Sequence, residues 1–139
     1  FTIPMLQSYV QILYYRMLPI VIKEEESQTK YSRTRQEEIF QRFIGEVEKH
    51  YRRERSGKFY ADSLCISPKY LSTVVYKVSR QLAGQWIDAY VILEAKTLLK
   101  SGKLTIQQIS EQLNFSNQSF FGKFFKRCAG MSPKDYMNS

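Results

Sequence analysis

Cysteine and histidine are scarce in this sequence of 139 residues, and its glycines form no nucleotide-binding motif. These absences exclude several kinds of metal, disulfide and nucleotide site. The two cysteines, Cys65 and Cys128, have no CxxC spacing, and His50 is the single histidine. A four-ligand zinc site cannot be assembled from these residues. In a chain without a secretory signal, two such cysteines are more often buried free thiols than a disulfide. The six glycines form neither a GxGxxG motif nor a P-loop, so we expect no nucleotide cradle, no metal and no cofactor.

Catalytic and membrane-spanning patterns are missing as well. His50 lies in a polar helical run, residues 48–52, without a nearby nucleophile. This disfavours triads and histidine acid–base schemes, and the sequence predicts that the protein is not an enzyme. The apolar residues of segment 1–22 are interrupted by Arg16 and Pro19, so the segment is too polar for a membrane span. With no signal peptide expected, we predict a protein of the reducing cytoplasm without a membrane partner.

The sequence does have an ordinary apolar content and an uneven positive charge. Hydrophobic residues make up 43% of the chain and charged residues 24%, so a folded core is expected. Residues 1–50 have balanced charge, whereas residues 51–139 contain 14 Lys and Arg against 6 Asp and Glu and carry the whole net charge of +8. This asymmetry indicates a polyanionic partner, either nucleic acid or an acidic membrane surface. An ordinary solvated basic face is the third explanation of the charge alone.

Residues 1–33 differ in character from the rest of the chain. Apolar side chains recur every three or four positions in residues 1–22, which predicts a helix. Such a stripe is explained equally well as the core of a neighbouring domain or as a dimer seam. The hypothesis of a homodimer assigns the seam to Leu6, Val10, Leu13 and Met17. The polar residues 23–33 predict a linker, and the missing initiator methionine suggests a piece of a longer protein.

A short unit occurs twice in the remainder. Residues 60–67 match residues 109–116 at an offset of 49, and after one inserted residue the match continues at an offset of 50. Each copy predicts a short helix, a tight turn and a longer helix, with Ser67 and Ser116 as N-caps. This is the layout of a helix-turn-helix, predicted at about 59–80 and about 105–129. Four further patterns predict a helix from 34 to about 54 after a Thr34–Glu37 capping box, a connecting helix at about 84–101 ending before Gly102, a capping box at Thr105–Gln108, and a last helix from Ser132-Pro133 to near Met137.

The longer helix of each copy has one apolar stripe and one outward stripe. The predicted buried residues are Leu71, Val74, Val75 and Val78 in the first copy and Phe120, Phe121, Phe124, Phe125 and Cys128 in the second. The predicted outward residues are Lys69, Ser72, Thr73 and Tyr76 in the first copy and Ser119, Gly122, Lys123 and Lys126 in the second, with Asn117 and Gln118 at its tip. Such residues bond base edges and phosphates, and a mid-helix glycine is costly unless something must come close, which we take to be DNA. An ordinary solvated helix face is the alternative for either copy alone.

The stretch from Ile109 to Arg127, continued by Gly130 to Tyr136, resembles the C-terminal signature of the AraC/XylS family of bacterial transcription regulators. The resemblance covers about residues 34–138. It implies an all-α DNA-binding domain at 34–139 with seven helices, in which two helix-turn-helix units are joined by a long central helix. It also implies that residues 1–26 are the last helix of a truncated sensor and dimerisation domain, and that 27–33 are the linker.

The resemblance further implies a sequence-specific regulator, expected to be an activator, that inserts two recognition helices into adjacent major-groove segments of double-stranded promoter DNA. The implied base-reading residues are Lys69, Ser72, Thr73, Asn117, Gln118, Ser119, Gly122 and Lys123. The implied phosphate contacts are Tyr76, Lys77, Arg80, Ser116, Lys126 and Arg127. RNA polymerase is the implied protein partner, and the expected location is the bacterial cytoplasm, on the nucleoid when bound to DNA.

Three positions depart from the family pattern. Arg80 stands where members usually have the glycine that ends the first recognition helix, so we expect that helix to run on or to gain a phosphate contact. Thr73 stands where many relatives have arginine, which weakens the expectation of guanine reading. Gly122 has no side chain at a position that often reads bases. The competing hypothesis is a basic helical adaptor that binds protein partners or acidic surfaces without reading bases.

Overall fold

The structure is a computed structural model that describes Ile12 and residues 35–139. Within these residues every regular element is a helix, which confirms the all-α prediction. The helices are α2 (Arg35–His50), α3 (Gly57–Ser63), α4 (Pro68–Ser79), α5 (Ala83–Ser101), α6 (Ile106–Gln112), α7 (Gln118–Ala129) and α8 (Pro133–Asn138). The residues predicted to form the N-terminal helix, the linker, the Thr34 cap and the dimer seam (Leu6, Val10, Leu13 and Met17) lie outside the described part of the chain.

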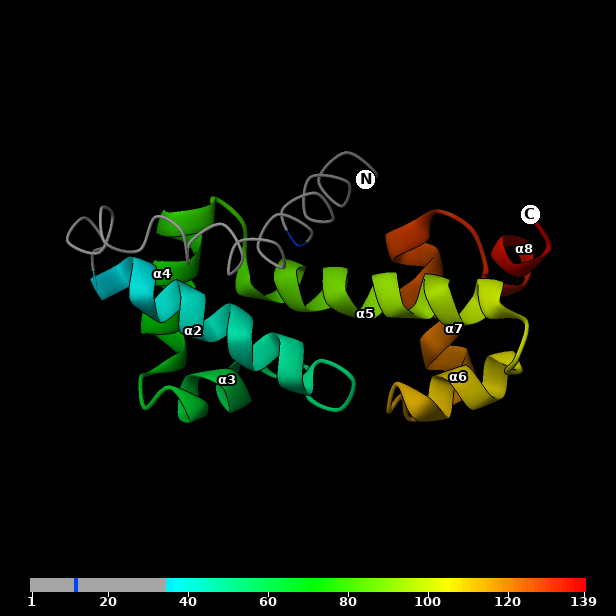
Figure 1. Cartoon of the computed structure of the whole chain (residues 1–139), viewed down its shortest axis with the longest axis horizontal. Coiled ribbons are helices and arrows are strands. Elements are labelled where there is room, and N and C mark those ends of the chain that lie inside the picture. The colour runs from blue at the N-terminus through cyan, green and yellow to red at the C-terminus, as the bar shows by residue number, and fades with distance from the viewer. Residues whose placement is uncertain (1–11, 13–34) are drawn as a thin grey trace, which may run out of the picture.

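The central helix α5 runs along the long axis of the molecule and joins two lobes (Figure 1). Helices α2, α3 and α4 form the first lobe, and α6, α7 and α8 form the second. None of the first three packs extensively on any of the last three. Helices of both lobes pack on α5, which is therefore the main connection between them. Its 19 residues span about 28 Å at about 1.5 Å per residue. No helix among the described residues is long and apolar enough to cross a membrane.

The first lobe is held by aromatic contacts between α2, α3 and the start of α5. The rings of Phe40 and Trp86 meet edge to face with centroids 5.6 Å apart, and those of Phe43 and Tyr60 with centroids 5.8 Å apart. Trp86 also donates a hydrogen bond from Nε1 to Ser79 Oγ at the end of α4, at 2.9 Å. Such edge-to-face pairs add to the free energy of burial. The two ring pairs hold α2 against α5 and α3, and the Trp86–Ser79 hydrogen bond ties the end of α4 to the central helix.

The second lobe has a core of phenylalanines. Phe115, in the turn before α7, lies 5.2 Å from Phe121 and 5.3 Å from Phe124 between ring centroids. Phe125 meets Tyr136 of α8 at 5.5 Å, and its side chain is fully buried. The predicted apolar stripe of α7 is therefore buried at Phe121, Phe124, Phe125 and Cys128.

The helix predicted from 34 to about 54 is too long at its C-terminal end. Helix α2 ends at His50, and residues 51–53 form turns in which the Arg53 and Glu54 amides both donate to the His50 carbonyl. The buried ring of Tyr51 continues the apolar periodicity of α2 after the α-helix has ended. The pattern alone could therefore not locate the end. The segment 51–56 instead makes bonds to other parts of the molecule, which are described below.

Two predictions at the ends of the recognition helices are corrected. Helix α4 does not run on past Ser79, because Arg80 adopts the left-handed conformation (φ 62°) and its amide donates to the Tyr76 carbonyl. Helix α7 begins at Gln118, and its N-cap is Asn117, whose side chain accepts from the Phe120 amide. Ser116 was predicted as that cap, but it lies one residue earlier. The N-caps Ser67 and Asn117 correspond at an offset of 50, so Ser116 is the extra residue of the second turn and not the counterpart of Ser67 as the repeat had suggested.

Candidate nucleic-acid interface

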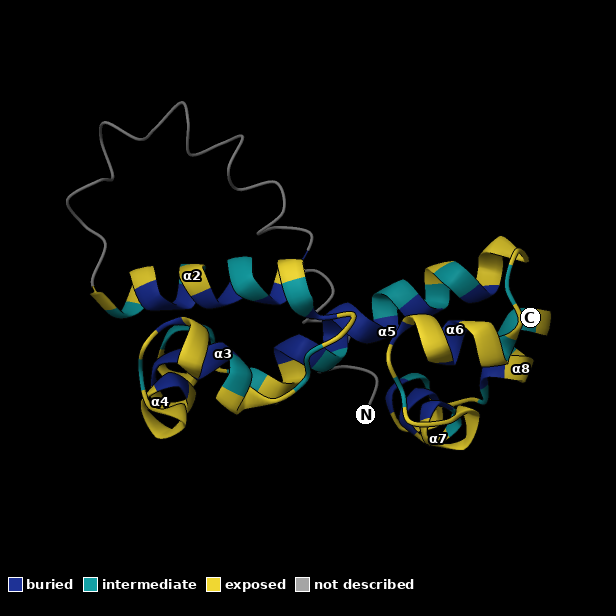
Figure 2. Ribbon diagram, turned by 90° about the horizontal axis from the view of Figure 1, so that it is seen from below, coloured by how far each residue is buried: buried dark blue, intermediate teal, exposed yellow. Residues whose placement is uncertain are grey.

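The two recognition helices lie on one side of the molecule. In Figure 1, α4 and α7 run in roughly the same direction at opposite ends of α5, and both cross it steeply. Seen from below in Figure 2, both appear end-on along the lower side, with exposed residues turned away from α2. The buried residues of each helix face the core of its own lobe. This arrangement presents two parallel ridges to the same external surface.

The outward residues of α4 are exposed as predicted. They are Lys69, Ser72, Thr73, Tyr76 and Lys77, followed by Arg80 at the C-terminal end of the helix. Tyr76 has 49% of its side chain exposed, which is high for a tyrosine in a folded domain. The Thr73 hydroxyl donates to the Lys69 carbonyl of its own helix at 3.0 Å. Its hydrogen is therefore engaged, and only its lone pairs remain for an external group.

The outward residues of α7 are also exposed, with one exception. Gln118, Ser119, Lys123 and Lys126 are exposed, and Gly122 is half-buried between them. A β-carbon built on Gly122 would have no protein atom within 4 Å, so nothing in the fold requires glycine there. The ridge is thus indented at its centre. Asn117 and Ser116 are exposed just before the helix, and the Asn117 side-chain oxygen is engaged in capping.

Phe120 was predicted to be buried, and that prediction is wrong: 56% of its side chain is exposed. At about 100° per residue it lies roughly 40° beyond Phe124 on the helix surface. Phe124 is already at the margin of the core, with 8% exposed, so a side chain further round projects past it. The corresponding residue of α4, Tyr70, is 38% exposed. Both recognition helices therefore carry a partly exposed aromatic ring beside the outward ridge.

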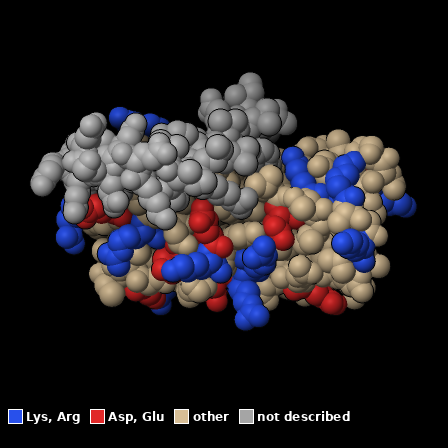
Figure 3. Space-filling view, viewed as in Figure 1, with Lys and Arg blue, Asp and Glu red and all other residues tan. Residues whose placement is uncertain are grey.

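The charge of the ridges has one sign. Neither α4 nor α7 contains an acidic residue, and their charged side chains are Lys69, Lys77, Lys123, Lys126 and Arg127. On the opposite face, which carries α2, basic and acidic side chains are interspersed (Figure 3). A surface that combines cationic and small polar side chains without carboxylates suits a polyanion with hydrogen-bonding groups.

Arg127 differs from the other cations because it has an ionic partner inside the protein. Its guanidinium lies 3.5 Å from the Asp88 carboxylate of α5 and 5.5 Å from the centre of the Phe124 ring. Burial raises the pKa of Asp88, and the charges of Arg127 and Arg55 oppose that rise. The ion pair holds Arg127 toward α5, so a phosphate would have to compete with a carboxylate for it.

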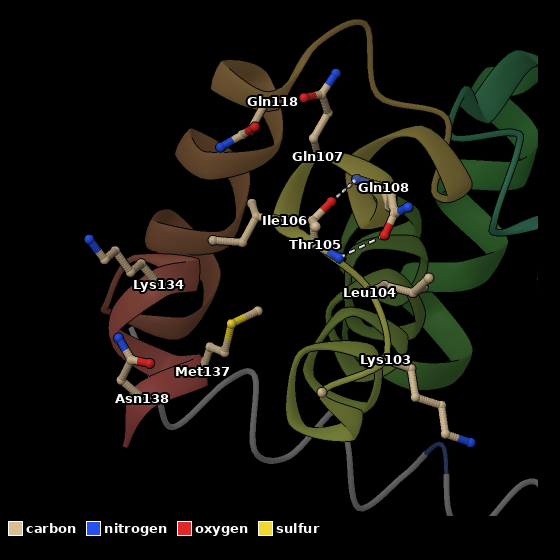
Figure 4. Close-up of a pocket in the computed structure, with 11 residues that line it drawn as sticks. Lys103, Leu104, Thr105, Ile106, Gln107, Gln108, Gln118, Lys134, Met137 and Asn138 are labelled. Carbon is tan, nitrogen blue, oxygen red and sulfur yellow. Dashed lines mark hydrogen bonds between the residues drawn. The ribbon is translucent and has the colours of Figure 1, made fainter.

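A shallow hollow of about 650 Å³ lies beside the start of α7 (Figure 4). It is bordered by the α5–α6 turn, by α6, by Gln118 and by α8. Gln107 and Gln118 lie at one end of it, while Lys103 and Lys134 lie at its edges. The capping bonds between Thr105 and Gln108, both drawn in the figure, confirm the predicted capping box and fix this wall. Leu104, Ile106 and Met137 also line the hollow, so its exposed surface is more apolar than polar.

The thiols and the histidine do not form a reactive cluster. Cys128 is buried, and burial raises its pKa to about 11. Cys65 is exposed, so the prediction of two buried thiols is correct only for Cys128. His50 pairs with Glu46 at 3.4 Å, and its ring meets Phe59. In the described residues no group of three or more His, Cys, Asp or Glu is placed to hold a metal ion.

The fold and its two exposed helices define a double helix-turn-helix protein. Residues 60–139 match the model of a family described as a helix-turn-helix domain, which is more than half of the chain. The matched segment contains both units. The chain belongs to the AraC/XylS family of DNA-binding transcription regulators, which are not enzymes.

Two characterised relatives illustrate the similarity in sequence. The arabinose operon regulatory protein of Escherichia coli strain K12 is 29% identical over 76 residues, which cover 55% of this chain and 26% of the relative. The transcriptional regulator AlkR of Acinetobacter baylyi is 30% identical over 76 residues, covering 55% and 25%. The similarity thus spans about a quarter of the length of these relatives.

Solved structures support the same fold. The C-terminal domain of AraT, a response regulator from Geobacillus stearothermophilus, superposes with a TM-score of 0.70 and 26% identity, covering 76% of this chain and 88% of that one. The DNA-binding domain of AdpA, solved in complex with a target DNA, superposes with a TM-score of 0.60 and 18% identity, covering 68% and 89%. At that identity the second likeness concerns the fold alone.

Proposed function

We propose that this domain binds promoter DNA sequence-specifically by inserting α4 and α7 into successive major-groove segments on one side of the duplex. The observation that carries the proposal is the common orientation of two exposed, carboxylate-free helices on one side of the molecule. Successive major-groove faces recur about every 34 Å along the duplex. A connecting helix of about 28 Å is of the length needed to set two recognition helices one turn apart.

Within this proposal the outward residues divide into two roles. Base reading is assigned to the N-terminal and central part of each ridge, where a recognition helix enters the groove: Lys69, Ser72, Thr73, Asn117, Gln118, Ser119, Gly122 and Lys123. Phosphate contact is assigned to the flanks and helix ends: Tyr76, Lys77, Arg80, Ser116, Lys126 and Arg127. The second unit is expected to discriminate bases more strongly, because Gln118 and Lys123 have long side chains that carry N–H donors, whereas the Thr73 hydroxyl donates to its own helix.

Base selection followed by substitution tests the proposal. Bound sites would first be selected from a random duplex pool with the purified protein. Lys123→Ala and Gln118→Ala should each lower the affinity for the selected site by about 1–3 kcal/mol and leave the affinity for random DNA nearly unchanged. Lys126→Ala should weaken both alike and reduce the slope of log affinity against log salt by about one.

The matched control is Lys49→Ala, which removes an exposed lysine from α2 on the other side of the molecule. Its effect on the affinities for the selected site and for random DNA should be no larger than the effect of removing one distant positive charge. Equal losses on selected and random DNA for Lys123→Ala would contradict base reading. That result would favour the adaptor hypothesis, in which the exposed Phe120 and Leu82 side chains, each 56% exposed, contact a protein.

We also propose, on the family likeness alone, that the intact protein activates transcription through contact with RNA polymerase and dimerises through Leu6, Val10, Leu13 and Met17. Transcription in vitro from a promoter carrying the selected site tests the first part. Sedimentation equilibrium of the intact protein at high concentration tests the second, and a monomer there would contradict it.

A further inference from the structure

A loop of the first lobe reaches directly into the second lobe. This loop, residues 51–56, connects α2 to α3, and its Arg55 side chain points to the turn between α6 and α7. The Arg55 guanidinium donates from Nη2 to the Leu113 carbonyl and from Nη1 to the Asn114 carbonyl, the latter at 3.5 Å. In the reverse direction, Asn114 donates from Nδ2 to the Arg53 carbonyl at 2.9 Å. These bonds join residues 58 to 61 positions apart.

The Arg55 side chain also touches the core that supports the second recognition helix. Its guanidinium carbon lies 4.2 Å from the centre of the Phe115 ring, and that ring packs on Phe121 and Phe124 of α7. A cation over an aromatic face in a partly desolvated site is a directional contact. At the other end of the loop, Tyr60 donates from its hydroxyl to the Glu54 carbonyl at 2.7 Å and so ties the loop to α3. A continuous chain of contacts therefore runs from α3, through Arg55, to α7.

The position of Arg55 is one that stability alone does not explain. Burial lowers its pKa, with Asp88 and Tyr60 acting in the opposite direction, and its Nε is buried without a hydrogen-bond partner. Burying a partly satisfied charge is costly, and replacing such a group by an apolar one of similar size is often neutral or stabilising. A partly satisfied arginine at a junction between two lobes is therefore better explained by the geometry that it imposes than by the stability that it adds.

We propose that Arg55 is a positioning residue that fixes the angle and separation between α4 and α7, and thereby makes the protein selective for the spacing between its two DNA segments. Apart from these bonds the two lobes are connected chiefly through α5, the element on which helices of both lobes pack. The hydrogen bonds of Arg55 and Asn114 form a second connection between the two lobes, in addition to α5. The inference rests on the proposed insertion of both helices into DNA.

The primary test compares spacing tolerance in Arg55→Met and in the unchanged protein. Duplexes would carry the selected site with its two segments moved apart by one base pair, which shifts one segment by about 3.4 Å and turns it by about 34°. We expect this insertion to weaken binding of the unchanged protein by a factor of about 30 or more and that of Arg55→Met by about fivefold or less. The affinity for a short duplex carrying only one segment should be the same for both proteins.

The hydrogen bonds of Arg55 and Asn114 between the 51–56 loop and the α6–α7 turn are called the brace below. Two further variants distinguish loss of the brace from loss of charge and from loss of folding. Arg53→Met removes the same charge from the same loop, but only the backbone carbonyl of Arg53 takes part in the brace, so its spacing penalty should remain that of the unchanged protein. Asn114→Gly removes the reciprocal hydrogen bond at a residue whose φ of 59° glycine accepts readily, and it should relax the spacing penalty partly. A normal spacing penalty in both Arg55→Met and Asn114→Gly would overturn the inference.

A measurement without DNA keeps this inference distinct from the proposed function. Spin labels at Lys58→Cys in α3 and Lys134→Cys in α8, in a Cys65→Asn background, report the distance between the lobes. The distance distribution should broaden in Arg55→Met and stay narrow in Arg53→Met. If the unchanged protein does not discriminate DNA sequences, the proposed function fails while the distance result still stands. An unbroadened distribution in Arg55→Met would overturn the brace whatever the DNA result.

Discussion

The two helix-turn-helix units have left-handed residues at the same two places, yet different residues occupy those places. In the turn, Cys65 of the first unit and Asn114 of the second both have left-handed conformations, with φ of 57° and 59°. At the end of the recognition helix, Arg80 has φ of 62° and Gly130 has φ of 82°. Asparagine and glycine tolerate this region, whereas cysteine and arginine are strained there. The comparison shows that packing of the helices imposes the left-handed turn geometry. The residue type only changes the conformational free energy of that geometry.

The units differ in their surfaces as well. The ridge of α7 carries Lys123 and Lys126 around the indentation at Gly122, whereas α4 has Ser72 at the position that matches this glycine. The first ridge is therefore continuous and the second is notched. If both enter DNA, the second should approach the duplex more closely. The predictions below test these differences, beginning with the largest effect.

The largest effect is expected in the cores of the two units. Phe125→Ala should lower the free energy of unfolding by about 3–5 kcal/mol, because a fully buried ring leaves a cavity. Val75→Ala at the matching position of α4 should cost about 2 kcal/mol, because it removes less buried volume. Phe120→Ala, with the ring more than half exposed, should change stability by less than about 1 kcal/mol. Urea denaturation measures all three, and a large loss for Phe120→Ala would contradict the exposure described here.

The left-handed helix ends should respond to opposite substitutions in opposite directions. Gly130→Ala should destabilise the protein by about 1–2 kcal/mol, since alanine is strained at φ of 82°. Arg80→Gly should stabilise it by about 0.5–1 kcal/mol by relieving the same strain. Thermal unfolding at fixed pH measures both changes. A destabilised Arg80→Gly would mean that the arginine side chain makes contacts that outweigh the strain of its backbone.

The smallest change in stability is expected at the notch of α7, where it should be accompanied by a loss of binding. Gly122→Ala should stabilise the fold by about 0.5–1 kcal/mol, because alanine favours a helix and its β-carbon would meet no protein atom. It should also weaken DNA binding if the duplex comes close to this position. Gly45→Ala in α2 has equally open surroundings and is the matched control. It should stabilise by a similar amount and leave DNA binding unchanged, and equal binding by the two variants would argue against a close approach at Gly122.

Much of the fold could be predicted from the sequence because its signals are local. The duplicated pattern predicted both recognition helices, and the Thr105 capping box and the end of α5 at Gly102 are confirmed. Errors arose where a local pattern continues past a boundary that distant contacts decide. The apolar position of Tyr51 extended the predicted helix α2 too far, and the phenylalanine run placed Phe120 in the core.

The candidate interface could be predicted only in part. The exposure of the outward residues follows from helical periodicity, since each outward residue lies opposite a buried one. The ion pair of Arg127 with Asp88 and the bonds of Arg55 to the second lobe have no signal in the sequence, because they join residues from 39 to 59 positions apart. Spacing rules within one helix say nothing about such pairs.

By itself the sequence determined an all-helical chain with a repeated pair of helices, a cationic outward stripe on each longer helix, and the caps at Ser67 and Thr105. These features depend on interactions within a few residues, which periodicity and side-chain type describe well. Only the tertiary structure decided that both stripes face the same side, that the Phe120 ring at the edge of the core stays exposed to solvent, and that Arg55 joins the two lobes. Those outcomes depend on how two separate cores pack on α5, and that packing combines small contributions from contacts far apart in the chain.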